Sequence, residues 1–381
     1  MSTDYEANRP TKLTGGVSGF YVFEQLWYRN GTFYAFQDNT TIDTQPFPDR
    51  DTIMSGPHDT VLLPITTQQE LFRELDGEIR FLKGQTLFLN DGADQWNWSY
   101  LSWFHHFAAE VLLGGITALS LARSVEDAKS IPRLMIPWEG NWKDGYGINE
   151  VMVSGMFGKD LVEKDQWDRW SEKGDWVGFE KVVIVDRYAS HRHNPIANEW
   201  NKMALPIFSE LPAPPPPFFT PYREALLHNL GLAIPPTRQQ YGKSLNKIPK
   251  IVYLDRQDTN RKLTEGDHKG LLDVLKGLEK ERKAVVGVPH LAEMDCRYQV
   301  KAVKDADVII GVHGNGLTHQ MWMSEGGVVI ELFIPDALLR DYEVLSQALG
   351  HRHIATWGDR ILPPSEWGYF KGELNPTILH N

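Results

Sequence analysis

The sequence predicts an α/β protein with two domains. The chain has 381 residues, which is more than one ordinary hydrophobic core accommodates. From Lys250 onward, short apolar runs alternate with segments of helical composition, which is the pattern of a doubly wound parallel sheet. The run PAPPPPFFTP at residues 212–221 cannot enter the interior of a sheet, so it marks the junction between the domains.

The proline run and the change in pattern divide the chain into four parts. The first domain covers residues 1–211, and residues 212–249 form a linker with a short helix. The second domain covers residues 250–362. Residues 363–381 form a loop-rich tail that could cross back onto the first domain.

The first domain shows a less regular alternation of strands and helices. Residues 1–60 alternate aromatic residues with turn formers, which predicts short strands or an irregular wrap. The rest of the domain predicts strands at 84–90, 133–137 and 179–185, with helices at about 98–123 and 148–157.

The second domain follows a short helix that we expect at 222–230. Its apolar runs predict strands at 251–254, 284–288, 308–312, 328–333 and 354–357. Helices are expected between them, at 268–282, 294–304 and 337–350. Strands alternating with helices of this length indicate a parallel sheet.

The stretch Asp307–Phe333 is the most informative part of the second domain. Its strand, Val308–Val312, is rich in β-branched residues, as strands buried on both faces are. The strand ends in His313-Gly314-Asn315-Gly316, where two glycines allow a sharp turn and a close approach of the backbone to a ligand. Helical composition follows at Leu317–Met323, so free N–H groups at the start of that helix would favour an anion at the turn.

A basic segment precedes this stretch. Between Arg238 and Lys262 there are seven basic residues and two acidic ones, although the net charge of the chain is −11. Arg256 and Arg261 follow the strand 251–254, so they share the carboxyl-end layer of the sheet with the glycine turn. Two guanidiniums there could clamp a diphosphate, because each donates two aligned hydrogen bonds. The alternative is that both are solvated loop charges.

Two further residues of the second domain have two interpretations each. Glu331 is the one charge inside the strand 328–333, where a carboxylate can accept the hydroxyls of a ribose or cap a loop. His313 can donate to a phosphate or fill the turn.

The composition excludes several classes of protein. A net charge of −11 argues against bulk binding to nucleic acid or to an anionic membrane surface. Cys296 is the single cysteine, so the chain has no internal disulfide and no cysteine cluster for a metal. No apolar run approaches the roughly 18 residues of a membrane span, and the first residues lack a signal-peptide core. We expect a soluble chain.

Three motifs carry a resemblance to a known family. They are YLDRQDTNRKL at 253–263, the pair Gln299-Val300 that opens a helix, and the turn His313–Thr318, with the strand GGVVIELF after them. In this order, over about residues 250–335, they resemble family 61 of the glycosyltransferases. That family includes plant arabinosyl- and xylosyltransferases of xylan, and animal enzymes that transfer N-acetylglucosamine to proteins in the secretory pathway.

The resemblance implies a GT-B architecture, in which two Rossmann-like domains with parallel sheets face each other across a cleft. It further implies an inverting transferase that takes xylose, arabinose or N-acetylglucosamine from a UDP-sugar and needs no metal or other cofactor. The helix N-terminus and the arginines would neutralise the leaving diphosphate. The implied donor-binding residues are Arg256, Arg261, His313, Gly314, Asn315, Gly316, Leu317, Thr318 and Glu331. Asp305-Ala306-Asp307 has the form of a DxD motif, but it joins a helix to a buried strand, so we interpret it as structural.

The family usually carries a histidine four residues before a glutamate on an aromatic-rich helix of the first domain. His106 and Glu110 match this spacing, which places them on one helical face within reach of each other. Such a histidine could take the proton of the acceptor hydroxyl. The sequence departs from the family form at Trp103, where an asparagine is common, and in its second histidine, His105. A packed histidine pair without a catalytic role, or a base at Asp91 or Asp94, are the alternatives.

The acceptor side has the fewest sequence signals. Indole rings pack well on sugar rings, and the loop candidates are Trp96, Trp98 and Trp142, with Asp94 beside them. We expect a glycan or glycoprotein as acceptor and no nucleic-acid partner; the oligomeric state is open. The family points to the lumen of the Golgi or the endoplasmic reticulum if an N-terminal anchor was removed, whereas the chain as given leaves the cytoplasm open.

Two other classes of function are compatible with the sequence. One is a nucleotide-cofactor oxidoreductase, although the first strand of the second domain ends without a glycine fingerprint. The other is a glycan-binding protein that kept the fold and lost turnover.

Overall fold

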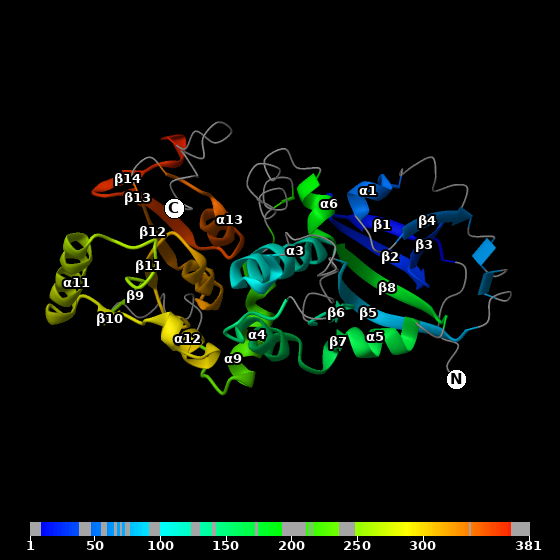
Figure 1. Ribbon diagram of the computed structural model, residues 1–381, viewed down its shortest axis with the longest axis horizontal. Helices are drawn as coiled ribbons and strands as arrows, with labels where there is room; N and C mark the ends of the chain where they lie inside the picture. The colour runs from blue at the N-terminus through cyan, green and yellow to red at the C-terminus, as the bar shows by residue number, and fades with distance from the viewer. Residues whose placement is uncertain are drawn as a thin grey trace. The chain divides into compact units, whose positions relative to one another are not determined.

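A computed structural model describes most of the chain (Figure 1). The described residues are 9–37, 47–54, 59–64, 67–68, 71–72, 77–90, 100–122, 130–138, 142–171, 174–192, 211–212, 214, 216–235, 248–334 and 337–366. The chain divides into two compact units. Unit 1 comprises Met1–Ser102, His106–Lys143 and Phe157–Pro214, and unit 2 comprises Trp103–His105, Asp144–Met156 and Pro215–Asn381.

Unit 1 is built on an eight-stranded sheet in the order β4-β3-β2-β8-β5-β6-β7, with β1 paired to β2. Its strands are β1 Lys12–Gly15, β2 Phe20–Arg29, β3 Thr32–Gln37, β4 Asp59–Pro64, β5 Ile79–Leu89, β6 Arg133–Ile136, β7 Leu161–Glu163 and β8 Trp176–Val185. The pairs β2–β3 and β2–β8 are antiparallel, whereas β5 is parallel to both β8 and β6. The parallel sheet that we expected in the first domain is confirmed only in part: β3–β4, β5–β6, β5–β8 and β6–β7 are parallel, whereas the aromatic N-terminal segment joins the sheet as an antiparallel hairpin.

Aromatic side chains fill the core of unit 1. One cluster includes Phe33, Phe88 and Trp167, and Phe33 meets Phe88 edge to face with ring centroids 5.2 Å apart. A second cluster is formed by Trp27, Phe36 and Trp176. The three tryptophans of these clusters are buried, so they stabilise the core and are not exposed to a ligand.

The helices of unit 1 are α1 Arg50–Ile53, α3 Leu113–Leu121, α5 Lys164–Ser171 and α6 Arg187–Arg192. A π-helical segment, His106–Leu112, leads directly into α3. Gly115 lets α3 lie close to the sheet, because a Cβ there would come within 2.3 Å of the Leu87 side chain and 2.8 Å of the Val185 side chain. The π-helical segment is consequently held over β5 and β8 by a tightly packed helix.

Unit 2 is built on a six-stranded sheet in the order β10-β9-β11-β12-β13-β14. Its strands are β9 Lys250–Leu254, β10 Val285–Gly287, β11 Val308–Val312, β12 Val328–Phe333, β13 Arg352–Trp357 and β14 Arg360–Leu362. All pairs are parallel except β13–β14. The parallel α/β sheet expected in the second domain is confirmed, with β11 and β12 at their predicted bounds.

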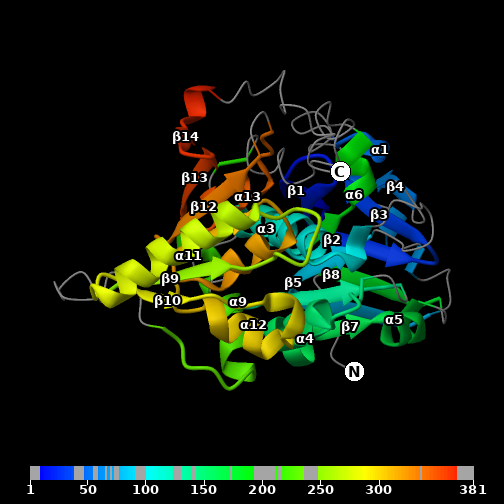
Figure 2. The same cartoon turned by 60° about the vertical axis from the view of Figure 1, so that its left-hand side comes forward.

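The helices of unit 2 are α4 Ile148–Phe157, whose last residue falls in unit 1, α9 Thr220–Asn229, α11 Glu265–Lys280, α12 Cys296–Val303 and α13 Asp341–Ala348. Thr264 and Asp295 cap α11 and α12 by accepting hydrogen bonds from the Asp267 and Tyr298 N–H groups. Leu275 of α11 packs with Tyr253 and Ile310 on one face of the sheet, and Figure 2 shows α11 lying against these strands.

Two predicted helices have unexpected geometry. The helix expected after the glycine turn is a 3₁₀ helix, Asn315–Trp322, and the one expected at 98–123 contains the π-helical segment. Among the helices of the described chain, none is long and apolar enough to cross a membrane.

Candidate functional site

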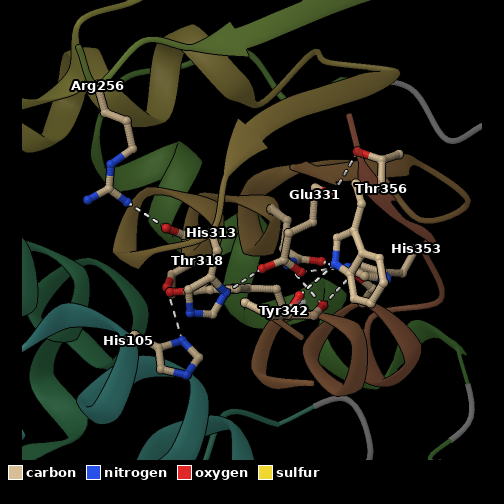
Figure 3. A network of polar contacts seen from close by, with 12 residues as sticks. His105, Arg256, His313, Thr318, Glu331, Tyr342, His353 and Thr356 are labelled. Carbon is tan, nitrogen blue, oxygen red and sulfur yellow. Dashed lines mark hydrogen bonds and ion pairs between the residues drawn. The ribbon is translucent and has the colours of Figure 1, made fainter. Parts of the chain in front are cut away.

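The carboxyl ends of β9, β11 and β12 bring together the residues predicted to bind the donor. Arg256 follows β9, His313 follows β11, and Glu331 lies near the end of β12 (Figure 3). Ligands of parallel α/β sheets bind at this edge. Thr318, Tyr342, His353 and His105 complete the polar network.

Arg256 is held in one orientation by two hydrogen bonds. Its Nε donates to Thr259 Oγ1 at 3.0 Å, and its Nη1 donates to the His313 carbonyl oxygen at 2.9 Å. The Thr259 hydroxyl also lies within hydrogen-bond distance of the carbonyl oxygens of Arg256 and Arg261, so it fixes the loop that carries both arginines. Burial, and then the positive charge of Arg261, lowers the pKa of the Arg256 guanidinium.

Gly314 makes room for this guanidinium. The residue has φ +146°, and a Cβ there would lie 1.8 Å from Arg256 Nη1. Any side chain at position 314 would therefore displace Arg256. The requirement explains why a glycine stands directly after His313.

The two arginines are not neutralised by carboxylates in the part of the chain that the structure describes. No salt bridge to Asp or Glu is found there for either Arg256 or Arg261. The positive charges of Arg256 and Arg261 both act to lower the pKa of Tyr342, against the larger effect of its burial. The charge of Arg261 also lowers the pKa of Arg256, after the larger effect of burial. The Asp258 carboxylate has the smallest of the effects on the pKa of Arg256, and two neighbouring like charges without an ion-paired carboxylate favour the binding of an anion.

His313, Glu331 and His353 form a row across three neighbouring strands. His313 Nδ1 lies 2.6 Å from Glu331 Oε1, and His353 Nε2 lies 2.7 Å from Glu331 Oε2. Glu331 pairs with Gly311 on β11 and Ala355 on β13, so small residues on both sides leave space for the histidine rings. The Glu331 side chain is fully buried, and both histidine side chains are 4% exposed.

The surroundings of this row are aromatic. The His313 ring stacks on Phe333 and meets Tyr342 edge to face, each with a centroid distance of 5.3 Å. Burial lowers the pKa of His353 to about 4, so this histidine is neutral at physiological pH. Burial, followed by Asp341 and Glu331, raises the pKa of Tyr342 well above its ordinary value.

The 3₁₀ helix after the glycine turn is anchored to His105. The backbone N–H of His105 donates to Asn315 Oδ1 at 2.8 Å, and its ring Nδ1 lies 3.2 Å from Thr318 Oγ1. Leu317 is 1% exposed and packs below the turn against Gly311. Asn315 and Thr318 thus position the turn, whereas the Leu317 side chain belongs to the core.

Unit 1 holds the second predicted site. His106 Nδ1 lies 2.8 Å from Glu110 Oε2, so the contact expected from the spacing is confirmed. Arg187, directly after β8, places Nη2 3.2 Å from the same Glu110 oxygen. The His106 side chain is 26% exposed, whereas Glu110 is 3% exposed. π-helical segments occur frequently at functional sites.

Two buried polar residues support this arrangement. Asn90 Nδ2 donates to Asp186 Oδ2 at 2.8 Å, and Asp186 Oδ1 accepts from the Ala189 N–H at the same distance. Both residues have no exposed surface and lie at the carboxyl ends of β5 and β8. They fix the backbone from which Arg187 reaches Glu110.

Comparison with known proteins identifies the family. A family model described as Glycosyltransferase 61 matches residues 102–330, which is more than half of the chain. The chain belongs to glycosyltransferase family 61. The resemblance carried by the motifs is confirmed. The matched range includes His106, Glu110 and His313, and it ends one residue before Glu331.

One curated relative is informative. The EGF domain-specific O-linked N-acetylglucosamine transferase of Drosophila melanogaster is 26% identical to this family 61 chain over 155 residues. The similar region covers 40% of this chain and 26% of the relative. The chain therefore matches about a quarter of the length of that relative.

Several predicted residues of the family 61 chain lie elsewhere. Asp305 is bonded to Lys304, and Asp307 accepts from the Lys250 N–H at the amino end of β9, so the DxD-like motif is structural as predicted. Trp142 is 3% exposed and stacks on Phe107, so its ring has no open face for a sugar and the structure counts against this candidate.

Asp91, Asp94, Trp96 and Trp98 lie outside the described residues. In the described part, no group of three His, Cys, Asp or Glu side chains is placed to hold a metal.

Sequence reasoning missed four residues that the structure adds to these sites: Arg187, His105, Tyr342 and His353. Arg187 directly follows the predicted strand 179–185, and the strand-end rule that selected Arg256 would also have selected it. His353 needed the register of β12 and β13, which places it diagonally opposite Glu331 on the same face. His105 was noticed only as a second histidine beside His106, and Tyr342 carried no sequence signal, because tertiary packing alone brings them to the turn.

Proposed function

We propose that the protein is an inverting glycosyltransferase of GT-B architecture that moves a sugar from a UDP donor to a hydroxyl of a glycan or glycoprotein. Membership of family 61 supports a transferase. The single observation that carries the donor half is the pair Arg256 and Arg261, which lacks carboxylate partners among the described residues and lies at the glycine turn.

The donor half of the reaction depends on charge. As the bond between sugar and diphosphate breaks, negative charge grows on the leaving phosphate oxygens. Arg256 and Arg261 would donate charge-assisted hydrogen bonds to these oxygens, and the N–H groups at the start of the 3₁₀ helix would add to them. These groups would act where other transferases use a divalent ion, so we propose transfer without a metal.

The remaining residues of the turn shape the donor site. Gly314 and Gly316 let the backbone approach the diphosphate, and Asn315, Leu317 and Thr318 hold the 3₁₀ helix in place. Glu331 was predicted to hold the ribose. Both of its oxygens already accept hydrogen bonds from histidines. A ribose hydroxyl would have to share one of these oxygens, so the ribose contact stays a prediction.

The acceptor half is assigned to His106. The Glu110 carboxylate accepts a hydrogen bond from His106 Nδ1, which leaves the lone pair of Nε2 for the proton of the attacking hydroxyl. Attack on the sugar from the face opposite the diphosphate inverts the configuration. Glu110 orients the ring, as a carboxylate does for a catalytic histidine.

The sugar and the acceptor follow from similarity. The Drosophila relative transfers N-acetylglucosamine and is specific for EGF domains, according to its name. We propose N-acetylglucosamine as the first sugar to test, with xylose and arabinose next. A protein acceptor of this kind would place the reaction in the secretory pathway.

A nucleotide screen tests this function. Thermal shift with UDP, GDP, ADP and their sugars should show stabilisation by the uridine compounds, and EDTA should leave it unchanged. Arg256→Ala should lower the affinity for UDP about ten- to a hundredfold, because it removes charge-assisted hydrogen bonds of roughly 1.5–3 kcal/mol. Arg352→Ala is the matched control, since this exposed arginine lies at the opposite, amino end of β13.

Failure of the proposal would be evident. No stabilisation by any uridine compound would reject the donor class, and equal UDP affinity of Arg256→Ala and the control would remove Arg256 from the site. Stabilisation that disappears with EDTA would reject the proposal that no metal is needed.

A further inference from the structure

The buried row of His313, Glu331 and His353 is joined by more hydrogen bonds than the binding of an anion alone would require. Both oxygens of Glu331 accept hydrogen bonds from ring nitrogens, at 2.6 Å from His313 and 2.7 Å from His353. Glu331 has no exposed surface, so its charge is far from solvent. A buried carboxylate of this kind is stable when hydrogen bonds and a positive charge compensate it.

The two histidines contribute differently to this compensation. His353 has a pKa lowered to about 4 by burial, so it is neutral and donates the hydrogen of Nε2 to Glu331. His313 donates the hydrogen of Nδ1 to the other oxygen. In the described residues, nothing forms a hydrogen bond with His313 Nε2. This second nitrogen can bind a ligand, with or without a proton.

The remaining charged and titratable groups around His313 come from three segments, and two of these also carry a carboxylate: Asp258 in the loop after β9 and Asp341 in α13. Arg256 donates to the His313 carbonyl oxygen, and Arg261 lies in the same loop. Tyr342 of α13 faces the ring and stays neutral, because burial and nearby carboxylates raise its pKa. The His105 ring is next to Tyr342, with centroids 4.9 Å apart.

These groups oppose one another until an anion binds. Glu331 favours a positive His313, whereas Arg256 and Arg261 disfavour it. A diphosphate between the arginines and Nε2 would cancel the repulsion and add its own attraction for the proton. The balance of charge around His313 would therefore change when the nucleotide arrives.

We propose that Glu331 and His353 are positioning residues that hold His313 as an imidazolium against the diphosphate, so that nucleotide binding takes up one proton. This inference rests on the proposed function and deepens it. The proton comes from the solution and forms the N–H bond at His313 Nε2. That N–H then donates to a leaving phosphate oxygen as the bond to the sugar breaks and the diphosphate takes the electron pair.

The proposed protonation of His313 also favours turnover. Once the sugar has left, UDP is held by a hydrogen bond that depends on this proton. Loss of the proton to solvent weakens the hold on UDP. Product release and proton release are then one event, whereas arginines alone would hold UDP equally at every pH near neutrality.

Proton uptake is measured directly with the wild-type protein. UDP is titrated calorimetrically at pH 7.0, 7.75 and 8.5, each in two buffers of different ionisation heat, where the terminal phosphate is already ionised. We expect the affinity to fall with rising pH, by up to tenfold per unit. The difference between buffers should show uptake approaching one proton at the highest pH.

Variants locate the proton. His313→Asn keeps a donor at the position of Nδ1 but removes Nε2, so it should bind UDP more weakly, without proton uptake and with an affinity independent of pH. Glu331→Gln keeps the shape and removes the charge, so uptake should fall below the wild-type value. Circular dichroism melts establish that each variant is folded.

The outcomes separate the two proposals. If no UDP binds at any pH, the proposed function fails. If the wild-type protein binds UDP with a flat pH dependence and no buffer effect, the function stands and this inference is overturned. It is also overturned if folded His313→Asn takes up the same proton as the wild type.

Discussion

In the described part of each unit a histidine ring contacts a buried glutamate, His106 with Glu110 and His313 with Glu331, and the two sites differ in what else contacts the glutamate. In unit 2, Glu331 shares its second oxygen with the neutral His353. In unit 1, Glu110 shares one oxygen between His106 and the cation Arg187. The histidine that pairs with Glu331 is 4% exposed, and the one that pairs with Glu110 is 26% exposed.

The partner of the glutamate decides which histidine form is compatible with burial. With Arg187 present, the group of His106, Glu110 and Arg187 is electrically neutral when His106 carries no extra proton. With His353 present, the other group is neutral when His313 is positive, which is the form expected once a diphosphate offsets the charges of Arg256 and Arg261. Buried clusters of zero net charge are favoured. The same two residue types thus suit a base in unit 1 and a proton donor in unit 2.

The largest effect is expected at the proposed base. His106→Ala should lower the rate of transfer by roughly 10²–10⁴-fold, the usual contribution of a general base, because it removes the group proposed to take the hydroxyl proton. The affinity for UDP, measured by calorimetry, should be unchanged. His228→Ala, at an exposed histidine of α9, is the control. Normal turnover of His106→Ala would show that His106 is not the base, and the contrast between a base in unit 1 and a proton donor in unit 2 would be rejected.

A substitution at Gly314 tests whether the position of the Arg256 guanidinium determines the affinity for UDP. Gly314→Ala should lower the affinity for UDP by about ten- to a hundredfold, as Arg256→Ala does, because its Cβ would displace the Arg256 guanidinium from its hydrogen bonds. Gly270→Ala is the control, since a Cβ on this glycine of α11 would meet nothing within 4 Å. Equal affinities of the two variants would show that the position of Arg256 does not matter.

Arg187 tests the charge argument in unit 1. Arg187→Gln removes the cation that contacts Glu110 and the His106 ring, so the carboxylate should orient His106 less well and the rate of transfer should fall about tenfold. Arg187→Lys keeps the charge and should retain more of the rate, while the affinity for UDP should stay unchanged in both variants. Equal rates of Arg187→Gln and Arg187→Lys would mean that the cation does not support the base.

The strands of unit 2 could be predicted from the sequence because local patterns determine them. The runs Val308–Val312 and Val328–Phe333 are apolar and bounded by glycines, and both strands have the predicted ends. Since parallel strands present their carboxyl ends at one edge, Arg256, His313 and Glu331 could be placed together from the sequence alone.

What could not be predicted depends on register and on geometry that composition does not determine. The row from His353 to His313 requires the pairing of β12 with both neighbours. The hairpin of β2 and β3 turned the expected parallel sheet of unit 1 into a mixed one. The π-helical segment was also unexpected, because its sequence is equally suited to an α-helix.

The smallest functional effect is expected at His353, the neutral partner of Glu331. His353→Gln can keep a donor at the position of Nε2, so the affinity for UDP should fall only about twofold to threefold. Its main effect concerns acid stability. Burial lowers the pKa of His353 to about 4, below the 6.5 of an exposed histidine, so the unfolded state binds the proton more readily. Folding stability is therefore lost as pH falls from about 6.5 towards 4.

This loss can be measured by urea unfolding at pH 7 and pH 5. The share of His353 is about 2 kcal/mol over that range, and His353→Gln should lose less stability than the wild type by about this amount. His319, whose pKa burial lowers to about 3, contributes equally to both proteins and cancels in the comparison. The same loss in both proteins would mean that His353 is protonated without cost. Glu331 would then have two histidines able to carry charge, and the contrast with the Arg187-bound pair would disappear.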